Sequence, residues 1–155
     1  MSKRSETRGF VLCYHFYMEL NIYTDGGSRG NPGISGYGLV IYDENQKIVC
    51  KESKFLGIKT NNEAEYLAII ASLEWIKKNQ SFLTITKINF FADSQLMIRQ
   101  LQGVYKVKAP TLLPLFSRAQ QLLIQINLPH TFKDIRRDSN ELADKLANKA
   151  MDNHF

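Results

Sequence analysis

The sequence predicts a single α/β domain in which a mixed sheet carries helices on both faces. Strand-like segments over 20–25, 36–42 and 47–55 follow one another through short polar connections, as in an antiparallel meander. Later strands over 87–92 and 130–135 alternate with helical segments, which favours parallel pairing. A length of 155 residues and a hydrophobic content of 44% suit one domain with an ordinary core.

The domain is expected to span residues 18–155. The first strand runs into Asp25 and ends there, because four glycines and a proline follow within eight residues. Residues 1–17 show no sustained apolar period, so we expect a disordered or loosely attached extension.

The first helix is predicted to run from Thr60 to about Lys78. Thr60 and Glu63 have the spacing of a capping box, in which each side chain bonds the backbone amide of the other residue. The segment 66–73 is apolar almost all round, which indicates a helix packed centrally against the sheet.

Helix-capping residues, glycines and prolines predict three further helices. A short helix begins at Asp93 and Ser94 and ends near Gly103, and a longer one carries Pro110 in its first turn and reaches about Ile126. The last helix is capped by residues 138–141. It is expected to bury Leu142, Leu146, Ala147 and Ala150.

Charge and composition favour an anionic partner. The net charge is +5, and the segment 99–137 contains seven Lys or Arg residues and one Asp. A solvated basic face would give the same count. No apolar run approaches the ~20 residues that span a bilayer. Cys13 and Cys50 lack metal-ligand spacing and fit a reducing compartment, so we expect a cytoplasmic protein without membrane contact.

Four carboxylates stand out by their positions: Asp25, Glu65 and Asp93 near ends of predicted elements, and Asp144 in the last helix, past its first turn. Glu63 already completes the cap of the first helix, which leaves Glu65 free. Asp93 has an alternative role as a helix cap, which Ser94 can also fill. Carboxylates gathered in a partly buried site repel one another unless a hard cation lies among them. The pattern therefore indicates magnesium, and two ions about 4 Å apart are the basis of two-metal phosphodiester hydrolysis.

Four motifs together resemble type 1 ribonuclease H. They are Thr-Asp-Gly-Gly-Ser-x-Gly-Asn-Pro-Gly at 24–33, Thr-Asn-Asn-x-x-Glu at 60–65, Ala-Asp-Ser-Gln at 92–95 and Asn-Glu-Leu-Ala-Asp-Lys-Leu-Ala at 140–147. The resemblance covers residues 19–151 and implies the ribonuclease H-like fold, a five-stranded mixed sheet whose first three strands are antiparallel.

The resemblance also implies an activity and its site. The family cleaves the RNA strand of RNA/DNA hybrids and leaves 3′-hydroxyl and 5′-phosphate ends. The four carboxylates become the catalytic and metal-binding quartet for two Mg²⁺ ions, which Mn²⁺ can replace, in a monomer bound to a hybrid duplex. Substrate contacts map to Ser28, Gly30, Asn31, Thr60, Asn61, Asn62 and Gln95. Side-chain amides both donate and accept hydrogen bonds, as a 2′-hydroxyl requires.

Two features depart from the family pattern. None of His15, His130 and His154 matches the family's loop histidine, and Arg137 or Arg136 stands near that place. The long basic protrusion of some members is replaced by residues 103–108, whose Lys106 and Lys108 are expected to contact the DNA strand.

Two other functions remain open at this point. One is a nuclease of broader range that also cuts double-stranded RNA, because shorter loops make fewer contacts that select DNA. The other is a hybrid-binding module without activity. Four retained carboxylates argue against the second, since such a module gains only their repulsion.

Overall fold

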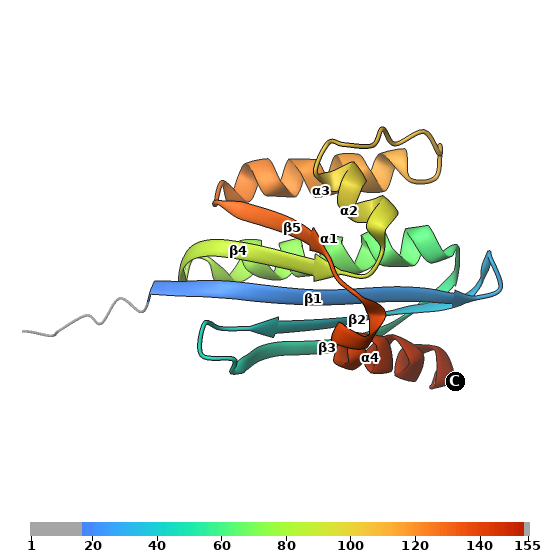
Figure 1. Cartoon of the computed structure of the whole chain (residues 1–155), viewed down its shortest axis with the longest axis horizontal. Helices are drawn as coiled ribbons and strands as arrows, with labels where there is room; N and C mark the ends of the chain where they lie inside the picture. Colours follow the sequence, from blue (N-terminus) through green and yellow to red (C-terminus); the bar gives the residue numbers. More distant parts are fainter. Residues whose placement is uncertain (1–16, 154–155) are drawn as a thin grey trace, which may run out of the picture.

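A computed structural model describes residues 17–153 and contains one five-stranded sheet in the order β3-β2-β1-β4-β5. Strand β1 pairs antiparallel with β2, β2 antiparallel with β3, β1 parallel with β4, and β4 parallel with β5. The predicted mixed sheet is therefore confirmed (Figure 1). The elements are β1 (Tyr17–Arg29), β2 (Gly33–Tyr42), β3 (Ile48–Lys59), α1 (Asn61–Asn79), β4 (Thr84–Ala92), α2 (Gln95–Leu101), α3 (Leu113–Ile126), β5 (His130–Asp134), the 3-10 helix η1 (Arg137–Ser139) and α4 (Glu141–Asp152).

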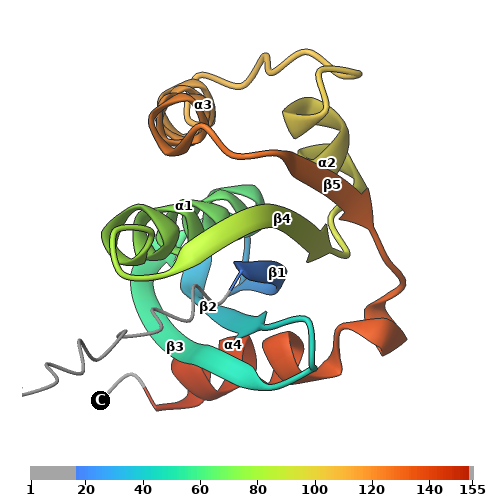
Figure 2. The ribbon, with the colours of Figure 1, turned by 90° about the vertical axis from the view of Figure 1, so that its left-hand side faces the viewer.

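Helices lie on both faces of the sheet, as predicted. Helix α1 packs against β1 and β2, α3 packs outside α1, and α4 lies on the opposite face across β1, β2 and β3. Figure 2, seen along the strands, shows α1 and α3 on one side of the sheet and α4 on the other. None of the helices within residues 17–153 is long and apolar enough to cross a membrane.

Helix α1 is the central helix, as its apolar sequence predicts. Tyr66, Ile69 and Leu73 are almost completely buried between the sheet and α3. The capping box also forms: Thr60 Oγ1 accepts from the Glu63 amide at 3.2 Å, and Glu63 Oε2 accepts from the Thr60 amide at 2.8 Å. This cap fixes where α1 begins, and therefore where Glu65 lies.

The strands are longer than the sequence suggested. Strand β1 does not stop at Asp25 but continues to Arg29, which pairs with Ile34, and it begins at Tyr17, which pairs with Thr84. Strand β3 likewise reaches Lys59. The glycines of this segment stay in the strand because β2 pairs with β1 all the way to Arg29. Apart from Tyr17, the predicted extension lies outside the described residues.

Two helix predictions need correction. Helix α3 begins at Leu113, so Pro114 and not Pro110 lies in its first turn. On α4, Ala143 is buried and Leu142 is only partly buried. The buried positions of α4 are 143, 146, 147, 150 and 151, which have the spacing of one helical face.

Candidate active site

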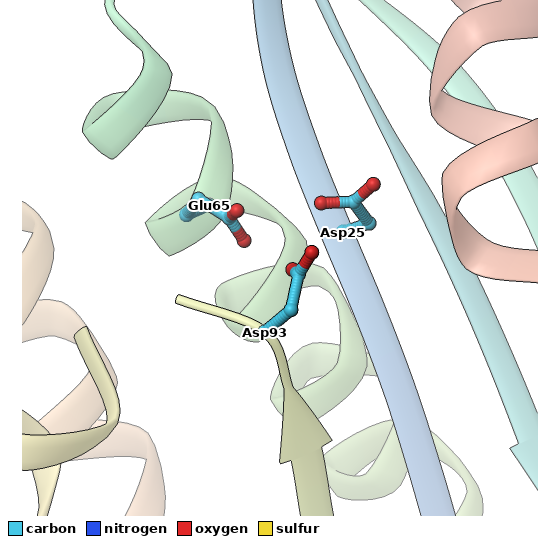
Figure 3. A group of neighbouring side chains, drawn as sticks. All are labelled: Asp25, Glu65 and Asp93. Carbon is cyan, nitrogen blue, oxygen red and sulfur yellow. The ribbon is translucent and has the colours of Figure 1, made fainter. Parts of the chain in front are cut away.

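Three of the predicted carboxylates meet at one end of the sheet. Asp25 lies on β1, Glu65 on α1, and Asp93 directly after β4. Strands β1 and β4 are parallel neighbours in which Thr24 pairs with Ala92, so the next residue of each brings a carboxylate to the same place. One oxygen from each carboxylate lies within 4.8 Å of the other two (Figure 3).

Glu65 reaches this place because α1 approaches β1 at a glycine. A Cβ atom on Gly26 would collide with the backbone of Ala64 and Glu65, and would lie 2.6 Å from the Ala64 carbonyl oxygen. The first turns of α1 therefore need a residue without a side chain directly after Asp25. The sequence Asp25-Gly26 is typical of a turn, but here the glycine lets the first turns of α1 lie directly against β1.

Asp93 is free of a capping role. Ser94 is the N-cap of α2, and its Oγ accepts from the Met97 amide at 3.3 Å. This settles the alternative that the sequence left open for Asp93. Its side chain is only 10% exposed and points toward Asp25 and Glu65 (Figure 3).

The carboxylates strongly perturb one another. Burial, the charge of Asp93 and a hydrogen bond with Asp144 raise the pKa of Asp25 to about 8. Burial and the charges of Asp25 and Asp93 raise the pKa of Glu65 well above its ordinary value, and a hydrogen bond from the Gly26 amide offsets only part of this. Asp25 therefore retains a proton near neutral pH when no cation neutralises the site.

The free oxygens of this group fit a hard divalent cation. Glu65 Oε2 and Asp93 Oδ1 are buried and have no hydrogen-bond partner within the described part of the chain. Buried polar atoms are normally satisfied, so two orphaned oxygens in one small group need an explanation. Oxygen donors are the preferred ligands of Mg²⁺, Mn²⁺ and Ca²⁺, and residues 25, 65 and 93 provide only oxygens.

The fourth predicted carboxylate, Asp144, lies beside Asp25 in the first turn of α4. The two side chains share a hydrogen bond, which contributes to the raised pKa of Asp25. Asp144 is half-buried and does not belong to the group of three that lies within 4.8 Å. The structure thus gathers three members of the predicted quartet closely and places the fourth against one of them.

Arg137, and not Arg136, faces the carboxylates. Its Nε lies 3.5 Å from Asp93 Oδ2, whereas Arg136 pairs with Asp138. The Arg137 side chain is otherwise exposed, so its charge is available to a bound ligand.

The glycine-rich segment and the start of α1 form one hydrogen-bonded unit. The Ser28 amide donates to Asn61 Oδ1 at 2.8 Å, and the Asn61 amide donates to Asn31 Oδ1 at 3.1 Å. The Ser28 hydroxyl lies 2.8 Å from the Lys59 carbonyl oxygen and also contacts the Gly30 carbonyl. Both amide oxygens are thus engaged within the protein. Asn31 and Asn61 are exposed, and their NH₂ groups are the parts that can meet a ligand.

The other predicted contacts differ in how available their side chains are. Gln95 and Asn62 are exposed at the first turns of α2 and α1. The Thr60 hydroxyl is engaged in its cap. Lys106 and Lys108 are exposed on the segment that connects α2 to α3.

Sequence reasoning missed the position of Asn140. It was assigned to a capping segment, but α4 has no side-chain cap. Asn140 is only 2% exposed, and its Nδ2 donates to the Thr24 carbonyl oxygen at 2.8 Å, next to Asp25. Its place four residues before Asp144 was the only signal in the sequence.

Comparisons with known proteins agree with this geometry. A family described as reverse transcriptase-like matches residues 23–150. A ribonuclease H of Ruthia magnifica is 35% identical over 147 residues, covering 84% of this chain and 94% of that protein. The bifunctional protein Rv2228c of Mycobacterium tuberculosis is 43% identical over 136 residues, covering 87% of this chain but only 36% of its own length. The chain thus spans about a third of that relative.

Solved structures show the same likeness. LC11-RNase H1 in complex with an RNA/DNA hybrid superposes with a TM-score of 0.83 at 40% identity, covering 87% of this chain and 98% of that one. The RNase H1 of Halobacterium salinarum gives 0.78 at 37% identity, covering 86% and 98%. The sequence match, the sheet order and the coverage together show that the chain belongs to the type 1 ribonuclease H family.

Proposed function

We propose that this protein is a divalent-metal-dependent endoribonuclease that hydrolyses the RNA strand of RNA/DNA hybrids. The observation that carries the proposal is the buried group of Asp25, Glu65 and Asp93, whose oxygens lie within 4.8 Å in a chain of the ribonuclease H family. A hybrid is the ligand of the related LC11-RNase H1. We expect the active protein to be a monomer.

The proposed metal ligands are Asp25, Glu65 and Asp93, with Asp144 completing the set. Two Mg²⁺ ions, or Mn²⁺ in their place, would activate a water and neutralise the charge of the phosphate. The protein's own contribution is to hold acceptor oxygens without partners, since Glu65 Oε2 and Asp93 Oδ1 are already desolvated. Asp25, whose pKa is about 8, would release its proton as the cations bind.

The reaction is a simple displacement at phosphorus. A water oxygen bonds to the phosphorus of an RNA phosphodiester while the bond from phosphorus to O3′ breaks. Of the two protons of the water, one goes to the O3′ leaving group and the other to the solvent. One fragment then keeps a 3′-hydroxyl, and the other carries a 5′-phosphate. Arg137, beside Asp93, is suited to attract the phosphate and to help release the product.

The RNA strand is proposed to lie on the unit formed by Ser28, Gly30, Asn31 and Asn61. The amide oxygens of the two asparagines already accept protein hydrogen bonds, so their NH₂ groups are left to donate. A 2′-hydroxyl oxygen is a suitable acceptor for such donors, and DNA lacks it. Asn62 and Gln95 extend the same surface. Thr60, Lys106 and Lys108 are proposed to meet phosphates of the DNA strand.

A cleavage assay on four matched duplexes tests the function. RNA/DNA, RNA/RNA and DNA/DNA duplexes, together with a hybrid in which the RNA and DNA strands are exchanged, are incubated with and without Mg²⁺. We expect metal-dependent cleavage of the RNA strand in both hybrids, with 5′-phosphate ends. Cleavage of RNA/RNA at a comparable rate would instead indicate the broader nuclease. Binding of the hybrid without cleavage would indicate a silent module.

A further inference from the structure

Asn140 occupies the N-cap position of α4 without capping the helix. Asparagine is among the residues that most often cap a helix through the side chain. Here the helix has no side-chain cap, because the Asn140 amide turns away and donates to the Thr24 carbonyl oxygen at 2.8 Å. The residue is only 2% exposed. A capping bond has thus been exchanged for a bond to a strand that lies 116 residues away in the sequence.

This bond connects two carboxylates. Thr24 immediately precedes Asp25 on β1. On the helix side, the Asp144 amide donates to the Asn140 carbonyl oxygen at 3.1 Å. Asn140 therefore links the backbone beside Asp25 to the helical turn that carries Asp144, through one hydrogen bond on each side.

The bond is also buried away from bulk solvent. Thr24 is fully buried, and both Thr24 Oγ1 and Asn140 Oδ1 are buried without a hydrogen-bond partner among residues 17–153. A hydrogen bond in such surroundings is stronger than one exposed to water, and water does not readily replace it.

Other contacts hold the middle of α4 against different strands. A Cβ atom on Gly38 of β2 would collide with the Ala143 carbonyl oxygen and would lie 2.7 Å from Leu146 Cβ. Ser53 of β3 donates from Oγ to the Leu146 carbonyl oxygen at 2.6 Å. These contacts set how closely the helix approaches β2 and β3, whereas the Asn140 bond ties the N-cap residue of the helix to β1.

We propose that Asn140 is a positioning residue that sets the separation of Asp144 from Asp25, and through it the affinity of the site for divalent metal. The inference rests on the proposed metal-dependent function. Groups that orient metal ligands typically contribute about 10- to 100-fold in metal affinity. Because Asn140 acts through a single ligand of the set, we expect an effect near the lower limit.

The test uses Asn140→Ser and Asn140→Gly in the full chain. Serine and glycine are both accepted at N-caps, so α4 is retained while the bond to Thr24 is lost. Calorimetric titration with Mg²⁺ in the absence of nucleic acid should show roughly tenfold weaker binding. The Mg²⁺ midpoint for hybrid cleavage should shift by the same factor. At saturating metal, kcat should recover most of its value, and KM for the hybrid should stay unchanged.

Ser53→Ala is the matched control. It removes a side-chain hydrogen bond to the same helix, at Leu146 and away from the carboxylates. It should lower the melting temperature and leave the Mg²⁺ midpoint in place. A purely structural role for Asn140 would give this same pattern in Asn140→Ser, and that result would overturn the inference.

A double mutant identifies the route of the effect. In an Asp144→Asn background, Asn140→Ser should weaken Mg²⁺ binding no further, because the ligand it positions is gone. Full additivity would also overturn the inference. The proposed function is judged separately: it fails if the wild-type chain does not cleave the hybrid with Mg²⁺, whereas the inference fails if wild type and Asn140→Ser bind Mg²⁺ equally well.

Discussion

The backbone amide of Ser28 donates to Asn61 Oδ1 at 2.8 Å, so the glycine-rich end of β1 and the first residue of α1 hold each other in place. The bond also orients the Asn61 amide, because its oxygen faces the protein and its NH₂ group faces solvent. The Asn61 oxygen thus holds the loop, and the NH₂ group is free to bind substrate. A substitution that keeps the oxygen but removes the NH₂ group can separate these two roles.

We expect Asn61→Asp to keep the loop and weaken substrate binding. The carboxylate still accepts from Ser28, but it has no donor and repels phosphates. KM for the hybrid should rise by about tenfold, because one hydrogen bond to the substrate is lost and a negative charge is added near the phosphates. The melting temperature should stay within a few degrees. Asn45→Asp, in the exposed turn between β2 and β3, adds the same charge elsewhere and serves as the control. Equal KM changes in both variants would place Asn61 away from the substrate.

Asp93→Asn should abolish cleavage and stabilise the metal-free protein. The amide nearly matches the carboxylate in shape but removes a charge that helps to raise the pKa of both Asp25 and Glu65. Melting in EDTA should therefore occur at a higher temperature than for wild type, with hybrid binding retained. Calcium should stabilise the wild type without supporting turnover, because its coordination shell is less regular. A lower metal-free melting temperature for Asp93→Asn would contradict mutual repulsion in this group.

The metal-free protein should lose stability as pH rises. The pKa of Asp25 is raised in the folded state from 3.8 to about 8, so between these values the folded state binds more protons than the unfolded state. The stabilising contribution is complete below pH 3.8 and is lost as pH rises through about 8. Melting temperatures in EDTA at pH 6 and pH 9 should show this decline. Asp25→Asn should flatten the profile, and so should Mg²⁺ for the wild type. A wild-type profile as flat as that of Asp25→Asn would refute the raised pKa.

Lys106→Ala combined with Lys108→Ala should weaken hybrid binding and reduce its dependence on salt. Each phosphate contact contributes a slope of slightly under about one in log affinity against log salt concentration. Fluorescence anisotropy in Ca²⁺ at several salt concentrations measures this slope without turnover. Lys77→Ala with Lys78→Ala, at the exposed end of α1, removes the same charge and should leave the slope nearly unchanged. Equal slopes in the two double variants would exclude Lys106 and Lys108 from the interface.

The parts of the fold and site that depend on local rules could be predicted from the sequence. Asp25 and Asp93 directly follow Thr24 and Ala92, the last residue pair between the parallel strands β1 and β4. The Thr60–Glu63 cap fixes the start of α1 and the place of Glu65. Such features involve residues close in sequence or strands whose order follows from the pattern of elements.

The parts that depend on contacts between distant segments could not be predicted. A glycine is required at position 26 of β1 because any Cβ atom there would collide with the backbone of α1 at Ala64 and Glu65. This requirement is visible only when the helix and the strand are placed together. Helix α3 begins at Leu113 and not near Pro110, and the sequence alone does not distinguish them because Pro110 and Pro114 both suit a first turn. Asn140 looked like a cap since its partner, Thr24, lies on the first strand of the sheet.

The placement of Asp144 on α4 joins metal binding to local unfolding. Helix α4 is the last helix of residues 17–153, and its 12 residues carry one of the four proposed ligands. A cation that binds the complete set more tightly than the other three carboxylates must favour the docked helix over a frayed one. Amide hydrogens of α4 would then exchange more slowly when Mg²⁺ is present, although most of the helix lies away from the ions. Bound divalent ions would then hold α4 against β1, because Asp144 lies on the helix and Asp25 on the strand.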